Sequence, residues 1–200
     1  MFYKDEKIVL ASQSPRRLQI LRQVGIEPIV RPVDIEESAP AGLRDICDTP
    51  MLLAKAKMHA AEINDSEIVI AADTVVISPD NEILGKPQDR ADAERMLRSL
   101  SGREHRVVTG FAIKDKITKI SDRVVTKVVM DEIDEQDLQS YLDTDEPYDK
   151  AGAYAIQGLG ARFVSGIEGD YYNVMGLPVN IILKVLNIYF RPGRYGKTAE

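Results

Sequence analysis

The strongest constraint on the fold is the ten-residue run IVIAADTVVI, from Ile68 to Ile77. This apolar run is the best candidate in the chain for a central strand, and Asp73-Thr74 interrupts it. A carboxylate inside such a strand is costly in free energy unless it meets a positive partner or a metal ion. Asp73 therefore has two structural interpretations, as a cap at a bulge or as the partner of a buried basic group. It also has two functional ones, as a general base or as a Mg²⁺ ligand.

Strands and helices alternate along the rest of the chain, which indicates an α/β fold with a mixed sheet and flanking helices. With 200 residues and 44% hydrophobic content, we expect one domain over residues 1–200, undivided or in two lobes around a central cleft. Residues 191–200 are predicted to form a frayed tail. Strands are predicted over residues 7–11, 28–33, 68–77 and 160–167, with two or three more in 105–130. Helices are predicted over residues 15–24, 49–63, 89–100, 134–143 and 176–190.

Charge and cysteine usage exclude several classes of protein. The net charge of −6 argues against a nucleic-acid binder, while it leaves room for a local basic pocket. Cys47 is the only cysteine, so no internal disulfide can form, and a reducing compartment is expected. The N-terminal residues lack the apolar core of a signal peptide, and no apolar run approaches the roughly 20 residues of a membrane helix. We therefore expect a soluble cytoplasmic protein that binds neither nucleic acid nor membrane.

A polar cluster directly follows the predicted strand 7–11. It consists of Ser12, Ser14, Pro15, Arg16 and Arg17. Pro15 is expected at the first helical position, with the preceding serine as the N-cap. One interpretation is a capped helix with two solvated arginines. The other is an anion site, because a helix N-terminus offers free N–H groups and a positive dipole end, and arginines add charge-assisted bonds to phosphate.

Four further residues carry charge that could serve the same site. The adjacent acids Glu36 and Glu37 could supply one more metal ligand beside the strand carboxylate, and only one of them is expected to point inward. Lys55 lies in the predicted helix 49–63, and Lys86 lies in the tight turn LGKP. Each of these residues could equally be an ordinary surface charge.

A stretch rich in small residues, DKAGAYAIQGLGA, runs from Asp149 to Ala161. Its glycines would let the backbone approach a ligand closely. Gln157 can both donate and accept hydrogen bonds, as the recognition of a nucleic base requires. The alternative is a tight loop without a ligand.

In their order along the chain, the motifs LASQSPRR, AADTVV, LGKP, LSGREHRVVTG, EPYDKAGAYAIQGLGA and GIEGDYYNVMGLPV resemble the Maf family of nucleoside triphosphate pyrophosphatases. The resemblance covers residues 7–185. It implies an elongated α/β fold related to the inosine triphosphate pyrophosphatases. It also implies cleavage of a nucleoside triphosphate to the monophosphate and pyrophosphate with a divalent metal, Mg²⁺ or Mn²⁺. The resemblance is compatible with a homodimer, although no stretch of the sequence indicates one.

The resemblance also implies roles for individual residues. Asp73 matches the proton acceptor, and together with Glu37 it would hold the metal. The positions linked to substrate choice are Arg16, Thr74 and Gln157, and the pocket lining comprises Ser12, Ser14, Arg17, Lys55 and Lys86. The motif forms are similar to those of the branch that acts on dTTP and UTP, with modified pyrimidine nucleotides as further substrates. The alternatives are a 7-methyl-GTP pyrophosphatase and a nucleotide-binding regulator of septum formation and cell division.

Overall fold

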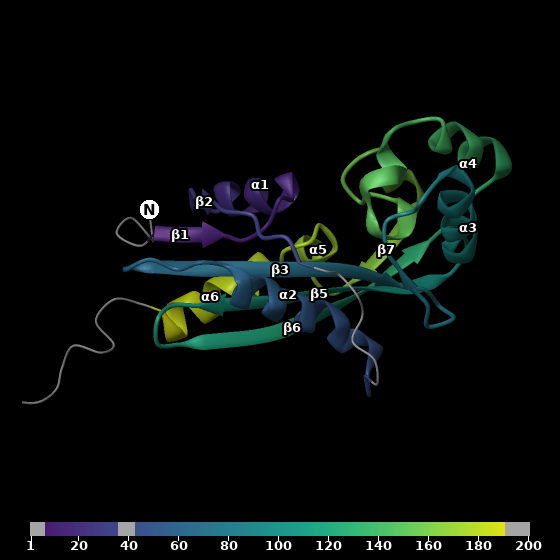
Figure 1. Cartoon of the computed structure of the whole chain (residues 1–200). Coiled ribbons are helices and arrows are strands. Elements are labelled where there is room, and N and C mark those ends of the chain that lie inside the picture. Colours follow the sequence, from purple (N-terminus) through teal and green to yellow (C-terminus); the bar gives the residue numbers. More distant parts are fainter. Residues whose placement is uncertain (1–6, 36–42, 191–200) are drawn as a thin grey trace, which may run out of the picture.

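The computed structural model describes residues 7–35 and 43–190, so Glu37 and the predicted tail 191–200 lie outside the described residues. The molecule is elongated, and one mixed sheet runs along most of it (Figure 1). The strands follow the order β2-β1-β3-β5-β6-β7, with β4 paired to β3. Their bounds are Lys7–Leu10 (β1), Ile29–Val30 (β2), Glu67–Ile77 (β3), Ile83–Leu84 (β4), Glu104–Lys114 (β5), Lys119–Met130 (β6) and Val164–Glu168 (β7).

The pairing of the strands confirms the predicted mixed sheet. Strand β1 is parallel to β2 and β3, whereas the remaining neighbours are antiparallel. The run from Ile68 to Ile77 forms most of the central strand β3, as predicted. Residues 105–130 form two long strands, β5 and β6. The predicted strand 28–33 contracts to two residues, and the short strand β4 was not predicted.

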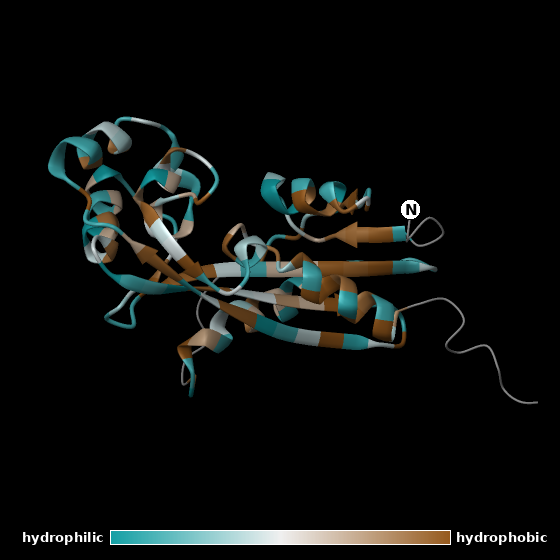
Figure 2. Cartoon of the chain, turned by 180° about the vertical axis from the view of Figure 1, so that it is seen from behind, coloured by the Kyte–Doolittle hydropathy of each residue, from teal (hydrophilic) through white to brown (hydrophobic). Residues whose placement is uncertain are grey.

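Alternation along β3 assigns its side chains to two different layers. Ile68, Ile70 and Ala72 belong to a core cluster with helices α1 (Pro15–Gln23) and α6 (Val179–Tyr189). Val69 and Ala71 belong to a second cluster with helix α2 (Thr49–Ala60) on the opposite face. Figure 2 shows the hydrophobic residues along β1 and the central strands in brown. Because both faces of β3 are covered, a polar residue on this strand must find its partners inside the protein.

A second lobe covers the other end of the sheet, where β5 and β6 meet helices α3 (Arg90–Leu100) and α4 (Glu135–Leu142) (Figure 1). The short helix α5 (Tyr171–Val174) lies beside β5 and β6. Four 3-10 turns, Ile46–Asp48 (η1), Glu146–Asp149 (η2), Ala151–Ala153 (η3) and Leu159–Phe163 (η4), complete the described elements. None of the helices in the described ranges is long and apolar enough to cross a membrane.

One glycine fixes the position of α2 on the sheet. A Cβ atom on Gly110 of β5 would lie 2.1 Å from the backbone nitrogen of Met51, in the first turn of α2. Only glycine leaves room for this approach. Gly110 is also the register partner of Asp73 on β3. The close packing therefore brings α2 over the part of the sheet that carries Asp73.

Candidate active site

A cavity of about 620 Å³ lies between α1, the middle of β3, one face of α2 and the second lobe. Strand β1 pairs with β3 only as far as Leu10 and Ile70, and β4 pairs with β3 from Val76 onward. Among the described strands, none covers this edge of β3 between those two points. The cavity occupies this gap, so Asp73 and Thr74 line it although their side chains lie on opposite faces of the sheet.

The carboxylate of Asp73 meets a buried ammonium group. Lys57 Nζ donates to Asp73 Oδ1 at 2.7 Å, and both side chains are only 10% exposed. The interpretation of Asp73 as the partner of a buried basic group is therefore confirmed. The pair still borders the cavity, so the contact does not remove Asp73 from the site.

The helix lysine that reaches the cavity is Lys57, and Lys55 is not part of the wall. Successive residues of an α-helix are rotated by about 100°, so two residues that are two positions apart face nearly opposite sides. The helix direction that brings Lys57 to Asp73 thus turns the half-buried Lys55 away. The predicted placement of Lys55 in the pocket lining is wrong, and Lys57 takes its place.

The serine-arginine cluster forms the start of α1, as predicted. Pro15 is the first helical residue and Ser14 is the N-cap, but the Ser14 side chain makes no capping hydrogen bond. The hydroxyl of Ser12 accepts a hydrogen bond from Ser14 N at 3.2 Å and another from Arg17 Nη1 at 2.9 Å. All these residues line the cavity, together with Arg16. The cap and the cavity wall are therefore the same segment.

The two adjacent arginines have different surroundings. The buried Arg17 also donates to the carbonyl oxygen of Gly176 at 2.9 Å and to Thr74 Oγ1 at 3.1 Å. Arg16 is half-buried and forms no hydrogen bond or ion pair with the residues that the structure describes. Burial lowers the pKa of Arg16, although the negative charges of Asp149 and Glu146 act to raise it. Arg17 is thus engaged by the protein, whereas the Arg16 guanidinium remains available to a ligand.

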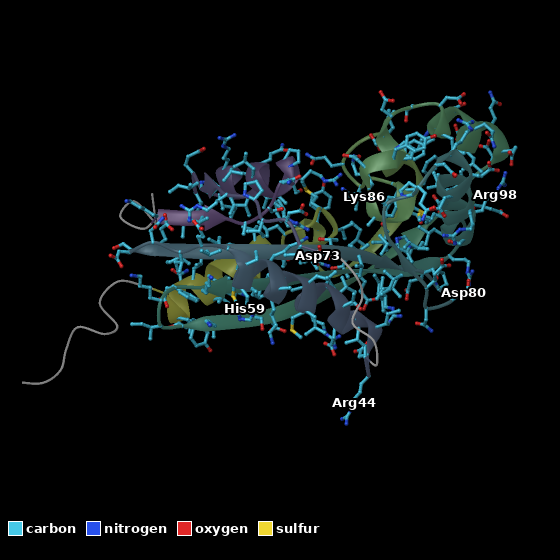
Figure 3. All side chains as sticks on the ribbon, in the orientation of Figure 1. Arg44, His59, Asp73, Asp80, Lys86 and Arg98 are labelled. Carbon is cyan, nitrogen blue, oxygen red and sulfur yellow. The ribbon has the colours of Figure 1, made fainter. Side chains whose placement is uncertain are left out.

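The second lobe adds further cations to the opposite wall. Figure 3 shows Lys86 on the side of this lobe that faces α1, with Asp73 near the middle of the sheet. Lys86 is exposed and Lys150 is paired with Asp149, and all three residues line the cavity. Burial acts to raise the pKa of Asp149, but the hydrogen bond from Lys150 and the charges of Arg16 and Lys86 lower it. Asp149 is therefore ionised at neutral pH, and it forms an ion pair with Lys150 on this wall.

A buried chain of hydrogen bonds leads from the cavity into the sheet. Thr74 Oγ1 lies 2.9 Å from Thr109 Oγ1 on β5, and Thr109 Oγ1 donates to the carbonyl oxygen of Asn173 at 2.9 Å. The side chain of Asn173, which is completely buried, donates to Val107 O at 3.0 Å and to Thr126 Oγ1 at 2.9 Å. Thr74 therefore stands at the cavity end of a fixed polar network.

The loop that carries Gln157 is anchored by one carboxylate. Glu146 accepts hydrogen bonds from the backbone nitrogens of Leu159 and Gly160, at 2.9 and 2.8 Å, and from the hydroxyl of Tyr141 at 3.0 Å. A Cβ atom on Gly158 would lie 2.2 Å from this carboxylate, so the close approach requires glycine. Gln157 itself is exposed on the cavity wall. The close approach of Gly158 is thus to a carboxylate of the protein itself, as in a tight loop, while a contact of Gln157 with a ligand stays a prediction.

His105 lies behind the cavity wall and not in it. Its Nε2 lies 2.7 Å from the hydroxyl of Tyr154, a buried residue that lines the cavity. Burial lowers the pKa of His105 to about 4, so the imidazole is neutral at pH 7. The Nδ1 atom is buried and has no hydrogen-bond partner among the described residues. We assign this histidine a role in supporting Tyr154.

The side chains of the cavity would hold a divalent metal only together with oxygen atoms of the substrate. The described residues contain no group of three acidic, histidine or cysteine side chains that could hold a metal ion. Mg²⁺ is, however, commonly bound by about one or two carboxylates that act with water and substrate phosphate oxygens. Asp73 supplies one carboxylate, and Glu37 lies outside the described residues. The buried hydroxyl of Thr49, which also lines the cavity, has no hydrogen-bond partner among the described residues.

The cavity is basic within an acidic protein. Its described lining contains five basic side chains and three acidic ones, although the whole chain has a net charge of −6. The basic residues are Arg16, Arg17, Lys57, Lys86 and Lys150, and the acidic ones are Asp34, Asp73 and Asp149. A cavity of this charge suits a polyanion. Lys57 was not predicted, and the only local sign of its position is that it shares the buried face of α2 with Leu53 and Ala54.

Comparison with known proteins places the chain in a family. The family model described as "Maf-like protein" matches residues 7–188. A dTTP/UTP pyrophosphatase of Exiguobacterium sibiricum is 46% identical over 91% of this chain and 92% of that protein. A relative with the same name from a Geobacter species is 45% identical over 92% of this chain and 96% of its own length. Another, from Clostridioides difficile, is 44% identical over 92% of this chain and 95% of its own length.

A solved structure of the Ham1 protein of Staphylococcus aureus gives a TM-score of 0.49 with 14% identity, over 91% of this chain and 98% of that one. The assignment to a family depends on the sequence relatives and on the matching family model, which spans β1 to α6. On these grounds, the chain belongs to the Maf family.

Proposed function

We propose that this protein hydrolyses dTTP and UTP to the nucleoside monophosphate and pyrophosphate. The observation that carries the proposal is the basic cavity, with a single carboxylate from the central strand held by Lys57 inside it. Family relatives named dTTP/UTP pyrophosphatase, at about 45% identity over most of the chain, support the same activity.

In the proposed reaction, water attacks the α-phosphorus and the bond to the bridging oxygen breaks, so that pyrophosphate leaves. The Asp73 carboxylate accepts the proton of the attacking water, as a general base does. Lys57 fixes the direction of this carboxylate through its hydrogen bond to Oδ1. Arg16 and Lys86, which have no described ion-pair partner, would contact the triphosphate and stabilise the charge that develops on the leaving group.

A divalent metal fits this arrangement as a cofactor shared with the substrate. Asp73, with Glu37 as a second candidate, would hold Mg²⁺ or Mn²⁺ together with phosphate oxygens. When bound, the metal would neutralise phosphate charge and polarise the reacting phosphoryl group. Ser12 and the positive dipole end at the start of α1 would stabilise the phosphates from the other side.

The experiment is a pyrophosphate-release assay on a panel of dTTP, UTP, CTP and 7-methyl-GTP, with Mg²⁺ and with Mn²⁺. We expect release from dTTP and UTP, and loss of release in the Asp73→Asn variant. Asp80→Asn is the matched control, because it makes the same chemical change at an exposed carboxylate on the second lobe, far from Asp73 in Figure 3. Preferential release from 7-methyl-GTP would replace the proposed substrate class. Nucleotide binding without release would favour a regulator.

A further inference from the structure

The single hydrogen of the Thr109 hydroxyl has two acceptors within reach, the carbonyl oxygen of Asn173 and Thr74 Oγ1. Thr109 Oγ1 lies 2.9 Å from the carbonyl oxygen of Asn173, and a carbonyl oxygen can only accept a hydrogen bond. Thr109 must therefore donate its hydrogen there. In its contact with Thr74 Oγ1, at 2.9 Å, Thr109 Oγ1 therefore accepts the hydrogen bond.

The hydrogen of Thr74 is consequently directed into the protein. It goes to Thr109 Oγ1, and the other acceptor within reach is the carbonyl oxygen of Gly176 at 3.5 Å. The Arg17 guanidinium donates to Thr74 Oγ1 at 3.1 Å, which uses one of its two lone pairs. For a ligand in the cavity that Thr74 lines, its hydroxyl then has one lone pair left and no hydrogen to donate.

The carbonyl group that sets this direction is itself held firmly. The Asn173 side-chain oxygen accepts from the backbone nitrogen of Thr109 at 3.1 Å, while its nitrogen donates to Val107 O and to Thr126 Oγ1. A reversed amide would place its NH₂ against an N–H group and its oxygen against a carbonyl, so only one orientation satisfies these partners. In addition, the Asp170 carboxylate caps the backbone nitrogen of Asn173 at 3.2 Å.

We propose that Thr109 is a positioning residue that makes Thr74 an acceptor-only contact for the imide N–H of uracil and thymine. The inference rests on the proposed function and deepens it. Uracil and thymine carry a hydrogen on the ring nitrogen between their two carbonyl groups, whereas cytosine carries a lone pair at the same position. Against cytosine, two lone pairs would face each other, and the contact would be lost.

Gln157 cannot provide this discrimination by itself. It is exposed, and none of the described residues forms a hydrogen bond with its side chain. Its amide group can therefore turn to present either a donor or an acceptor to the base. A group whose hydrogen direction is fixed is needed to distinguish the two bases, and Thr74 is such a group in the cavity wall.

The test compares kcat/KM for UTP and CTP in the full-length enzyme and in the Thr109→Val variant. Valine has nearly the shape of threonine, but it cannot accept the Thr74 hydrogen, so this hydroxyl becomes free to turn toward the ligand. We expect the UTP-to-CTP ratio to fall by about tenfold, which corresponds to about 1.4 kcal/mol. The Thr109→Ser variant keeps a hydroxyl at this position and should restore the ratio.

Thr126→Val is the matched control, because Thr126 and Thr109 are both completely buried and both contact Asn173, but Thr126 has no contact with Thr74. It should change the thermal stability and leave the UTP-to-CTP ratio as it is. An unchanged ratio in a folded Thr109→Val enzyme, or an equal fall in Thr126→Val, would overturn the inference. If Thr109→Val does not fold, Thr109→Ala removes the same hydroxyl and is judged in the same way. Wild-type enzyme that releases no pyrophosphate from UTP or dTTP would instead refute the proposed function.

Discussion

The adjacent residues Arg16 and Arg17 provide a sharp test of the site, because the same chemical change should lower the stability at Arg17 and the activity at Arg16. We consider Arg16→Met and Arg17→Met, since methionine keeps an unbranched apolar stem and removes only the guanidinium. Arg17 donates hydrogen bonds to Ser12, Thr74 and the Gly176 carbonyl. At about 1 kcal/mol for each, its loss should cost about 3 kcal/mol of the free energy of unfolding.

For a chain of this size, each kcal/mol shifts the melting temperature by about 2–4 °C, so Arg17→Met should lower it by about 6–12 °C. Arg16 has no described hydrogen-bond partner, and Arg16→Met should change the free energy of unfolding by no more than about 0.5 kcal/mol. A charge-assisted bond to phosphate amounts to about 1.5–3 kcal/mol. The same variant should therefore lose about 10- to 100-fold in kcat/KM.

The assays are thermal unfolding followed by circular dichroism and pyrophosphate release from dTTP. Arg17→Met is measured at a temperature where it is still folded. If both variants melt at the same temperature as the wild type, the hydrogen bonds of Arg17 are not structural. If Arg16→Met keeps full kcat/KM, its guanidinium does not contact the substrate, and the division of roles between the two arginines is refuted.

Three other predictions concern individual charges. Asp73→Asn should keep the fold and lose about 10²- to 10⁴-fold in turnover, and normal turnover on dTTP would exclude its role as the base. Lys57→Met should lower turnover by about 10²-fold, whereas Lys55→Met should leave turnover unchanged. Equal effects of the two variants in the pyrophosphate-release assay would contradict the conclusion that Lys57, and not Lys55, faces the cavity. The hydrogen bond from Arg31 lowers the pKa of Glu67 from 4.5 to about 2, so this carboxylate stabilises the fold above pH 4.5. That contribution is lost as the pH falls toward 2. The free energies of unfolding of Glu67→Gln and of the wild type, measured with urea, should therefore converge over this range.

Local sequence patterns predicted the elements that depend on local chemistry. Ser14-Pro15 marks the start of α1, and the helices predicted to begin at residues 89 and 134 do begin there, with Asp89 and Asp134 as their N-caps. Each of these signals acts within one helical turn, so it can be read without the rest of the fold. The apolar run around Asp73 likewise indicates a central strand, because burial on both faces requires apolar residues at nearly every position.

The parts that could not be predicted depend on contacts between distant segments. The hydrogen bonds of Asn173 to β5 join residues more than sixty positions apart, and its motif gives no local sign of that role. The pocket lysine was misplaced by two residues, because composition shows that α2 carries lysines but not which side of the helix faces Asp73. That direction is set by Gly110, where β5 lets the first turn of α2 approach closely.

The open edge of β3 at the cavity also has a consequence for solubility. Strand edges with unpaired backbone groups are templates for association between molecules, and proteins protect them with charges or covering segments. Here the uncovered stretch between the ends of β1 and β4 lies inside a cavity with Arg16 and Lys86 on its wall. Charged side chains therefore stand beside this edge, which is one of the ways in which proteins protect open strand edges. Variants that open this cavity or neutralise its wall should be screened for aggregation as well as for activity.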